Sequence, residues 1–487
     1  METKGILSGV RDGTRPYSRE RMAVLVNRID KSVQENPDLL STLEKQYLER
    51  LKGELWDELK NDSIAVLYKE REPHLYSWCG DPGLLHVEAL MGGKAEFRTH
   101  EAEKSERRIY QPSYGAALRG AFWNIGFYSD LRIFAEWGSG NYIQNYKPSL
   151  GYPRNAEKDS SRATWDASDS YFTFQIRKFQ FEYGRDNVHW GPSAVSGLMF
   201  SGSTPPMDLF QLHFDIGPAL FTWFHGELRS DFPHKWITAH RLEFTPASGV
   251  NIGIQESVVY GNRGIELAYL NPILPFLAAQ HTLGNRDNVT IGLDADANRI
   301  RNLKLYGELF VDDFSSPWGI LSDYWGNKLA VIIGSLWIDP LRISNSALRL
   351  EYSRIDPFVY THDKPENVFE HYNVGLGSDL QPNSDRILFR WDQWFSLTWR
   401  GSVEYSTTRH GQGDRRMPHQ IEDGSEKHFL CGVVEHGHRL GISAEYEPFR
   451  DLVLRCQAAG VRMKNWQLNK GSNPRWFELI VSADWNW

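Results

Sequence analysis

The chain has 487 residues, 41 % of them hydrophobic and 13 % aromatic, and a formal net charge of −8. Its lysines and arginines are scattered, which argues against nucleic acid as a partner, because phosphate binding needs a concentrated basic surface. The longest apolar run, residues 265–279, contains Glu266, Asn271 and two prolines. It cannot supply the roughly 20 apolar residues of a membrane-spanning helix, so a helical membrane protein is excluded.

Helical periodicity is confined to the N-terminal part of the chain. Ser18 is placed to cap a helix that Pro37 ends, and Asp38 to cap a second helix with one apolar stripe. We therefore expect a small helical segment within residues 1–83, distinct from an all-β remainder at residues 84–487.

From Leu84 onward, apolar and polar residues alternate with the period of a β-strand. In the last segment Phe477 and Trp487 would point one way, and Glu478 and Asp484 the other. So charged a face cannot belong to a protein core, whereas an apolar face ending in tryptophan suits lipid and its interface. The pattern predicts an all-β transmembrane barrel of about eighteen antiparallel strands behind the helical segment.

The predicted strands are each about one bilayer crossing long. They lie at residues 86–98, 113–123, 128–137, 168–176, 179–184, 208–214, 217–225, 236–244, 250–260, 288–294, 300–311, 328–338, 346–355, 385–391, 394–406, 428–447, 451–462 and 475–487. An even number returns both ends of the barrel to the same side of the membrane, which we expect to be the periplasm.

The connections between these strands alternate in length, as they do in outer-membrane barrels. Tight turns are predicted at residues 177–178, 245–249, 295–299, 391–394 and 447–451. Long extracellular loops are predicted at residues 138–167, 185–207, 261–287, 356–384 and 407–427.

Residues 428–447 could instead form two strands hinged at His436-Gly437-His438, which would invert every strand before them. The apolar residues of this segment all fall on even positions, so one long strand keeps a single apolar face. We expect one strand.

The chain contains the motifs GVRDGTRPYS at residues 9–18, YGRDNVHWGP at 183–192 and YLNP at 269–272, and a further pattern at residues 372–385. These motifs resemble the Wzi-type capsule-assembly family of outer-membrane proteins. The resemblance covers nearly the whole chain. It implies a closed or plugged barrel that acts as a lectin at the cell surface, organises exported polysaccharide and has no catalytic activity.

Arg185, Asp186 and Trp190 place a cation, a carboxylate and an indole within one short loop. Sugar recognition uses such a set, because aromatic faces stack on pyranose rings and paired polar groups satisfy hydroxyls. The alternative is a salt-bridged loop anchor at the barrel mouth, in which Trp190 would be a packing residue.

Other charged and aromatic residues of the predicted outer loops are further candidates for a polysaccharide surface, or else solvated loop and girdle residues. These are Tyr142, Tyr146, Trp165, Trp318, Trp325, Asp414, Arg415, Arg416, Asp423 and Trp466.

The loop at residues 261–287 is too apolar to extend into water, and its prolines prevent a regular strand. We expect it to fold inward as a lumen plug that includes Tyr269, Asn271, Pro272 and Phe276. A lid that packs on neighbouring loops is the alternative.

No cofactor or metal site is expected from the sequence. Cys79, Cys431 and Cys456 match no zinc-ligand spacing, and His436 and His438 lack a third ligand. The sequence contains no nucleophile elbow, phosphate loop or zinc-binding His-Glu motif, so we expect no enzyme.

The leading hypothesis is a bacterial outer-membrane lectin that binds capsular polysaccharide or exopolysaccharide with its extracellular loops. Its barrel would lie in the lipid bilayer, and its periplasmic helical segment would contact the polysaccharide export machinery. The alternative is a porin or specific channel for small or sugar-like solutes. A soluble β-rich lectin or enzyme comes third.

Overall fold

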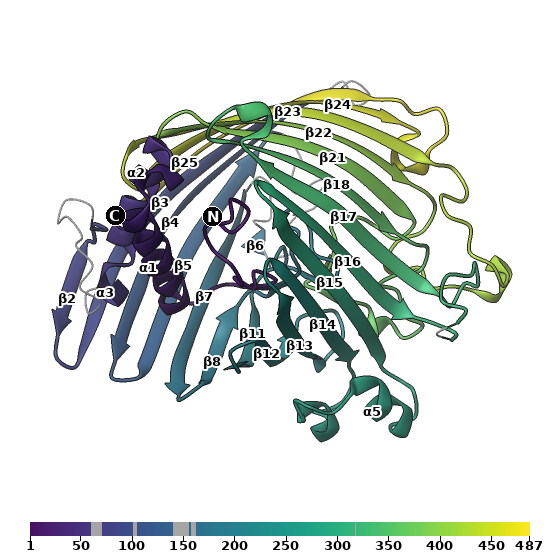
Figure 1. The fold of residues 1–487 in the computed structure, drawn as a ribbon. Helices are drawn as coiled ribbons and strands as arrows, with labels where there is room; N and C mark the ends of the chain where they lie inside the picture. Colours follow the sequence, from purple (N-terminus) through teal and green to yellow (C-terminus); the bar gives the residue numbers. More distant parts are fainter. Residues whose placement is uncertain (60–70, 101–104, 140–154, 157–161, 317) are drawn as a thin grey trace.

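A closed antiparallel β-barrel makes up most of the computed structural model (Figure 1). The structure describes residues 1–59, 71–100, 105–139, 155–156, 162–316 and 318–487. Over these residues 18 strands form the wall. They are β3 (Gly83–His100), β4 (Ser105–Phe122), β5 (Ile125–Gly138), β7 (Arg162–Ile176), β8 (Phe179–Asp186), β11 (Met207–Asp215), β12 (Ala219–Leu228), β13 (Lys235–Ala247), β14 (Val250–Tyr260), β15 (Asn288–Ile300), β16 (Leu303–Asp313), β17 (Lys328–Ile338), β18 (Ser346–Ile355), β21 (Ser384–Trp394), β22 (Trp399–His410), β23 (Glu435–Phe449), β24 (Leu452–Lys464) and β25 (Arg475–Asn486).

Each predicted strand corresponds to one of these, and β23 is a single strand as its apolar phase indicated. Two predicted turns were wrong. Residues 295–299 lie within β15, and residues 391–394 end β21, because both strands continue for several residues past the predicted ends. The turn that follows β15 is tighter, with Asn302 at a positive φ of 67°, and residues 395–398 connect β21 to β22.

The barrel closes where β25 pairs with β3, joining the last strand to the first of the wall. Beside this seam the short strand β2 (Tyr76–Gly80) pairs with the beginning of β3. The tight turns gather with the C-terminus at one end, here named the short-turn end. The opposite end carries the long connections and is named the long-loop end.

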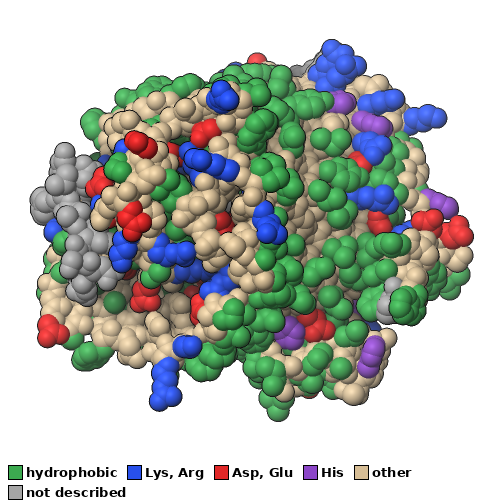
Figure 2. Space-filling model, in the orientation of Figure 1, with side chains coloured by type: hydrophobic (Ala, Val, Ile, Leu, Met, Phe, Trp, Pro, Cys, Tyr) green, Lys and Arg blue, Asp and Glu red, His purple; other side chains and the backbone are tan. Residues whose placement is uncertain are grey.

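Pair by pair, the register keeps one set of side chains on the outer face around the barrel. Val481 pairs with Cys456 on β24, and Leu479 with Phe97 on β3. Figure 2 shows hydrophobic side chains gathered over the wall of β15–β18. Exposed residues on this outer face include Ile254, Leu293, Leu305, Ile333, Leu350, Ile387, Leu440 and Ile442.

The N-terminal helices are α1 (Arg19–Glu35), α2 (Thr42–Glu54) and α3 (Trp56–Leu59). Ser18 caps α1 as expected, but the predicted cap Asp38 lies in a 3₁₀ turn, η1 (Pro37–Leu39). Ser41 caps α2 in its place, because its hydroxyl accepts from the Glu44 N–H while the Glu44 carboxylate accepts from the Ser41 N–H.

The helical hairpin docks on the short-turn end of the barrel (Figure 1). Its own core includes Val26, Leu48 and Leu59. Arg50 reaches from α2 to Glu447 with two hydrogen bonds of 2.6 and 2.8 Å. None of the helices that the structure describes is long and apolar enough to cross a membrane.

The remaining short elements belong to the loops and to the interior. They are β1 (Thr14–Arg15), β6 (Asn155–Ala156), β9 (His189–Trp190), β10 (Phe200–Ser201), η4 (Leu267–Leu270), α5 (Phe276–Thr282), η5 (Pro340–Arg342), η6 (Pro365–Asn367), β19 (Glu370–His371), β20 (Val374–Gly375), η7 (Ile421–Asp423) and η8 (Trp466–Leu468). Of these, β1, β9 and β10 form one three-stranded sheet, the inner sheet.

Candidate functional site

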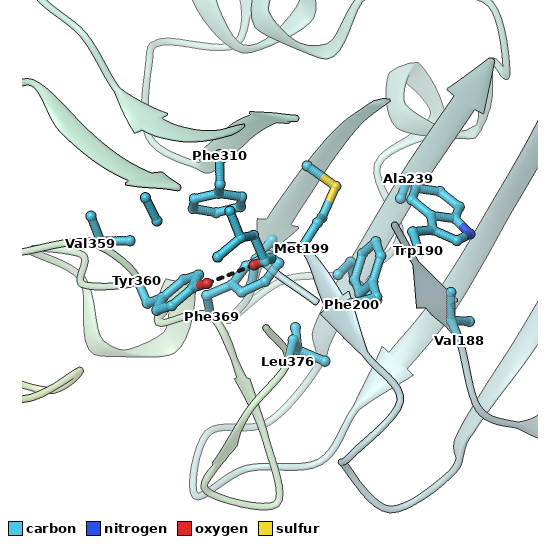
Figure 3. Packing of buried hydrophobic residues seen from close by; sticks show 14 of the residues in the cluster. Val188, Trp190, Met199, Phe200, Ala239, Phe310, Val359, Tyr360, Phe369 and Leu376 are labelled. Atoms are coloured by element: carbon cyan, nitrogen blue, oxygen red, sulfur yellow. Dashed lines mark hydrogen bonds between the residues drawn. The ribbon is translucent and has the colours of Figure 1, made fainter. Parts of the chain in front are cut away.

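Two long loops fold into the barrel and fill its interior (Figure 3). They are residues 187–206, named the first plug loop, and residues 356–383, named the second plug loop. The inward-facing wall residues that pack with them include Phe224, Ile237, Phe310 and Ile332. The loops contribute the buried side chains Val188, Trp190, Leu198, Met199, Phe200, Val359, Tyr360, Phe369, Leu376 and Leu380.

Aromatic contacts join both plug loops to the wall. The ring of Phe200 meets the ring of Phe224 edge-on, with centroids 5.3 Å apart. The rings of Phe310 and Tyr360 lie 5.1 Å apart. Such pairs add about 0.5–1.5 kcal/mol each to the free energy gained by burial alone, so the plug loops are held as a protein core is held.

Inward-facing carboxylates fix the backbone of the plug loops. Glu308 accepts hydrogen bonds from the backbone N–H groups of Ser193 and Leu198, at 3.1 and 2.9 Å. Asp312 accepts from the N–H of Tyr360 at 2.6 Å, and the Tyr360 hydroxyl donates to the Leu198 carbonyl at 2.7 Å (Figure 3). The lumen charges therefore serve as anchors for the plug.

The N-terminal residues close the lumen from the short-turn end. Arg241 is fully buried on the inner face of β13, pairs with Asp294 and donates from Nε to the Thr14 hydroxyl at 3.1 Å. Glu243 accepts from the Gly13 N–H and the Thr14 hydroxyl, both at 2.9 Å. The N-terminal segment thus lies inside the barrel, where the inner sheet links it to the first plug loop.

A cavity of about 330 Å³ remains between the N-terminal segment and the first plug loop. Its lining includes Asp12, Lys304 and Arg349. Lys304 pairs with Asp12 at 2.6 Å, and this lysine together with Arg15 lowers the pKa of Asp12, although burial acts in the opposite direction.

The predicted plug at residues 261–287 was wrong, because this loop packs on the outer face of the wall. Tyr269 and Phe276 are fully buried, but against side chains that point out of the barrel. These outward-facing residues are Trp223, Val258, Tyr260 and Val289. In Figure 1 the helix α5 accordingly lies beyond the ends of β14 and β15.

Polar groups on the outer face explain the position of this loop. Glu256 accepts hydrogen bonds from the N–H groups of Phe276 and Leu277, at 2.8 and 2.7 Å, and so caps α5. His240 contacts both Glu256 and the carbonyl of Pro272, each at 3.1 Å. The loop therefore covers a carboxylate and an imidazole on the outer face of the barrel. Asn271 and Pro272 lie in this cover and not in the lumen.

The proposed sugar triad is split by the wall of the barrel. Arg185 faces outward and forms two hydrogen bonds with Asp208, at 2.9 and 3.0 Å. Asp186 faces inward and accepts from the N–H of Asn187, and Trp190 is fully buried in the first plug loop. The alternative of an ion-paired anchor with Trp190 as a packing residue describes this loop correctly.

Trp165 also faces the interior. It lies on β7, 7 % exposed, with its ring stacked on Phe134 at a centroid distance of 5.2 Å. Tyr142 and Tyr146 lie outside the residues that the structure describes. Trp466 lies on the connection between β24 and β25, with its ring 6.4 Å from that of Trp476.

The loops that follow β16 and β22 bring several of the other candidates together. The ring of Trp325 stacks flat on that of His419, with ring centroids 3.9 Å apart. The backbone N–H of Trp325 donates to the carbonyl of Ser425. Trp318, on the same loop as Trp325, is 99 % exposed. Asp423 accepts from the N–H of Gln420 and shapes this loop.

Arg416 lies on the same long loop as His419 and forms a polar group with residues of the second plug loop. Arg416 donates to Glu370 at 2.8 Å and to the Asn373 side chain at 2.6 Å, and hydrogen bonding to Glu370 raises its pKa. Arg415 packs beside the second plug loop, where burial lowers its pKa. Asp414 accepts from the Arg416 N–H at 2.7 Å and orders the turn.

We name Trp318, Trp325, His419, Arg416 and Glu370 the loop face. Sequence analysis found the tryptophans and Arg416 but missed His419, Glu370 and Asn373. A histidine that follows a proline, as His419 does, is common in loop sequences, and so is a loop carboxylate such as Glu370. No local pattern therefore distinguished these residues. Their significance comes from contacts between segments about 50 to 90 residues apart.

Three groups of potential metal ligands occur among the described residues. They are Asp57, Cys79 and His86; Glu72, His74 and Glu88; and Glu2, Asp12 and Asp296. His436 and His438 belong to none of them.

Comparison with known proteins places this architecture. The solved structure of Wzi, an outer membrane protein involved in group 1 capsule assembly in Escherichia coli and described as a carbohydrate-binding β-barrel, superimposes with a TM-score of 0.59. It is 11 % identical, over 98 % of this chain and 96 % of that chain.

Two further structures resemble the barrel less. OprD from Pseudomonas aeruginosa gives a TM-score of 0.48 at 12 % identity, over 83 % of this chain and 93 % of that one. OccAB1 from Acinetobacter baumannii gives 0.49 at 8 % identity, over 82 % and 96 %. No curated protein sequence matches the chain.

The family model of capsule assembly protein Wzi matches residues 127–475, from β5 to the beginning of β25. The match covers well over half of the chain and includes both plug loops and the loop face. The chain belongs to the Wzi capsule assembly protein family.

Proposed function

We propose that this protein is an outer-membrane lectin that holds capsular polysaccharide or exopolysaccharide at the cell surface and catalyses no reaction. The observation that carries the proposal is the filled lumen, because a barrel packed with buried side chains offers no path to a solute. Family membership, and the carbohydrate binding named for the Escherichia coli protein, support polysaccharide as the ligand.

The proposed orientation follows from the two ends of the barrel. The short-turn end with the helical hairpin lies in the periplasm, where it would contact the export machinery, and the long-loop end lies outside the cell. The apolar outer face lies in the lipid bilayer.

The loop face carries the chemistry that a polysaccharide requires. The rings of Trp318 and Trp325 offer flat apolar surface for the C–H faces of sugar rings. Arg416, with the exposed Asn373 beside it, offers donors and acceptors for hydroxyl or carboxylate groups, and the buried carboxylate of Glu370 holds Arg416 in place. A long polymer can contact such a face at several sugar units without entering the barrel.

Substitution at the loop face tests the proposal. Trp318→Ala and Arg416→Ala should each weaken binding of polysaccharide extracted from the producing organism, by roughly 3- to 10-fold. Binding to immobilised polysaccharide is measured with the detergent-purified protein. Trp123→Ala is the matched control, because Trp123 is 81 % exposed at the short-turn end.

Equal binding by the wild type and both loop-face variants would place the ligand elsewhere. Loss of binding in Trp123→Ala to the same extent would show that any exposed indole matters, and would contradict a specific site.

A further inference from the structure

A cluster of metal-ligating side chains lies where the helical hairpin meets the barrel wall, away from the plug and the loop face. The cluster consists of Asp57 on α3, Cys79 on β2 and His86 on β3. One ligand atom of each residue lies within 4.8 Å of those of the other two. We propose that these three residues bind a divalent transition-metal ion at the short-turn end. A thiolate, an imidazole and a carboxylate are the donor set that Zn²⁺ prefers.

The distances within the cluster suit a shared ion. The His86 Nε2 lies 2.8 Å from the Asp57 Oδ2, and the Cys79 Sγ lies 3.9 Å from the Asp57 Oδ1. In a tetrahedral zinc site, bond lengths of about 2.0–2.3 Å put neighbouring ligand atoms roughly 3–4 Å apart. Small side-chain rotations therefore suffice to form the site, with water as the fourth ligand.

His86 is held in position for coordination. Its side chain is 4 % exposed, and its Nε2 faces the Asp57 carboxylate at 2.8 Å. The imidazole of His74 stacks on His86 at a centroid distance of 4.1 Å and restricts the ring. Coordination through Nε2 would let His86 and Asp57 bind the same ion.

The charges around the cluster favour a cation. Arg119 is shared among Asp57, Glu58 and Glu72 at 3.4–3.7 Å, and Arg19 pairs with Glu58 at 2.8 Å. Among the described residues, these guanidinium groups lie beside the carboxylates of Asp57, Glu58 and Glu72, and Glu88 pairs with His74. These carboxylates, together with a deprotonated thiolate of Cys79, would attract a divalent ion.

The ligands come from three elements, so the ion would have a structural effect. It would tie α3 of the helical hairpin to β2 and to β3, the strand that forms the seam with β25. We therefore expect the metal to hold the hairpin against the short-turn end.

Cobalt substitution tests the site. The untagged, full-length protein in detergent is stripped with chelator and titrated with Co²⁺, whose thiolate complexes absorb in the near ultraviolet. We expect a band that saturates at one equivalent and disappears when Zn²⁺ is added. Cys79→Ser should abolish the band, and His86→Gln should weaken Co²⁺ binding at least about 10-fold.

Cys456→Ser and Cys431→Ser are the matched controls, because both cysteines are exposed and lie outside the cluster. They should leave the band unchanged. A wild type without a thiolate band, or a band that survives Cys79→Ser, would overturn the proposal. Circular dichroism of each variant establishes that the barrel is folded, and polysaccharide binding, measured separately, keeps this test independent of the proposed function.

Discussion

At the scale of single residues, burial at the short-turn end decides the protonation of Asp451. This residue occupies the turn between β23 and β24 with a φ of 65°. Its carboxylate lies 3.4 Å from Arg50 and 3.7 Å from Arg450. Burial outweighs both cations and raises the pKa of Asp451 to about 6, from 3.8.

The pH dependence of stability follows from this shift. Between pH 3.8 and about 6 the folded protein holds a proton that the unfolded chain has lost, so the stability that Asp451 contributes falls as pH rises through this window. Asp451→Asn removes this dependence and tolerates the positive φ. At pH 7 we expect the variant to be more stable by about 1–3 kcal/mol, with the difference vanishing below pH 4.

Denaturant unfolding followed by tryptophan fluorescence measures the effect. A variant that is less stable at pH 7 would mean that the ion pairs with Arg50 and Arg450 outweigh the cost of burial.

At the scale of elements, the loop at residues 261–287 shows how a polar outer face is made compatible with a membrane. The N-terminus of α5 donates backbone hydrogen bonds to Glu256, and the apolar side chains of the loop pack on Tyr260 and Trp223. The wall residue Glu256 therefore stabilises the loop, and the loop in turn shields Glu256 from its surroundings.

Glu256→Ala should release this cover. Loss of the cap on α5 costs about 0.5–2 kcal/mol, so amide hydrogens of residues 261–287 should exchange faster while those of the plug loops do not change. Glu227→Gln, on the outer face of β12, two strands away from β14, is the control. Faster exchange in both variants would indicate a general effect of lost charge.

The strands were largely predictable from the sequence, because apolar and polar residues that alternate over about ten positions indicate both where a strand lies and which of its faces is apolar. The direction in which a loop folds was not. Tyr269 and Phe276 would be buried equally well in the lumen or against the outer wall. The hydrogen bonds from α5 to Glu256, on the outer face of β14, fix the loop outside. Trp190 failed as a sugar ligand for a related reason, since an indole suits a core and a pyranose alike. Asp57, Cys79 and His86 share no sequence spacing, so their proximity depends on the fold.

At the scale of the whole molecule, separate segments of the chain fill and close the lumen of the barrel. The plug loops, and not residues 261–287, fill it, and the N-terminal segment closes it from the other end. A conduction experiment can distinguish these parts.

The wild type in a planar bilayer should carry negligible current. Replacing residues 362–377 of the second plug loop by a short Gly-Ser linker should open a path, because it removes Phe369 and Leu376 from the core. Deletion of residues 265–280 from the outer cover is the control and should stay silent. Steady current from the wild type would contradict the closed lumen and favour the alternative of a solute channel.

The inner sheet bears on how this protein is assembled. Thr14 and Arg15 pair with Trp190 and His189 inside a wall whose seam joins β3 to β25. The two strands of the seam are the first and the last of the described wall strands in sequence order, so the wall stays open until the strands between them have paired. A segment docked during that interval is enclosed when the seam zips shut, whereas one left outside would have to thread through a mouth that the helical hairpin obstructs. The order of events, docking before closure, is thus built into the connectivity of the chain.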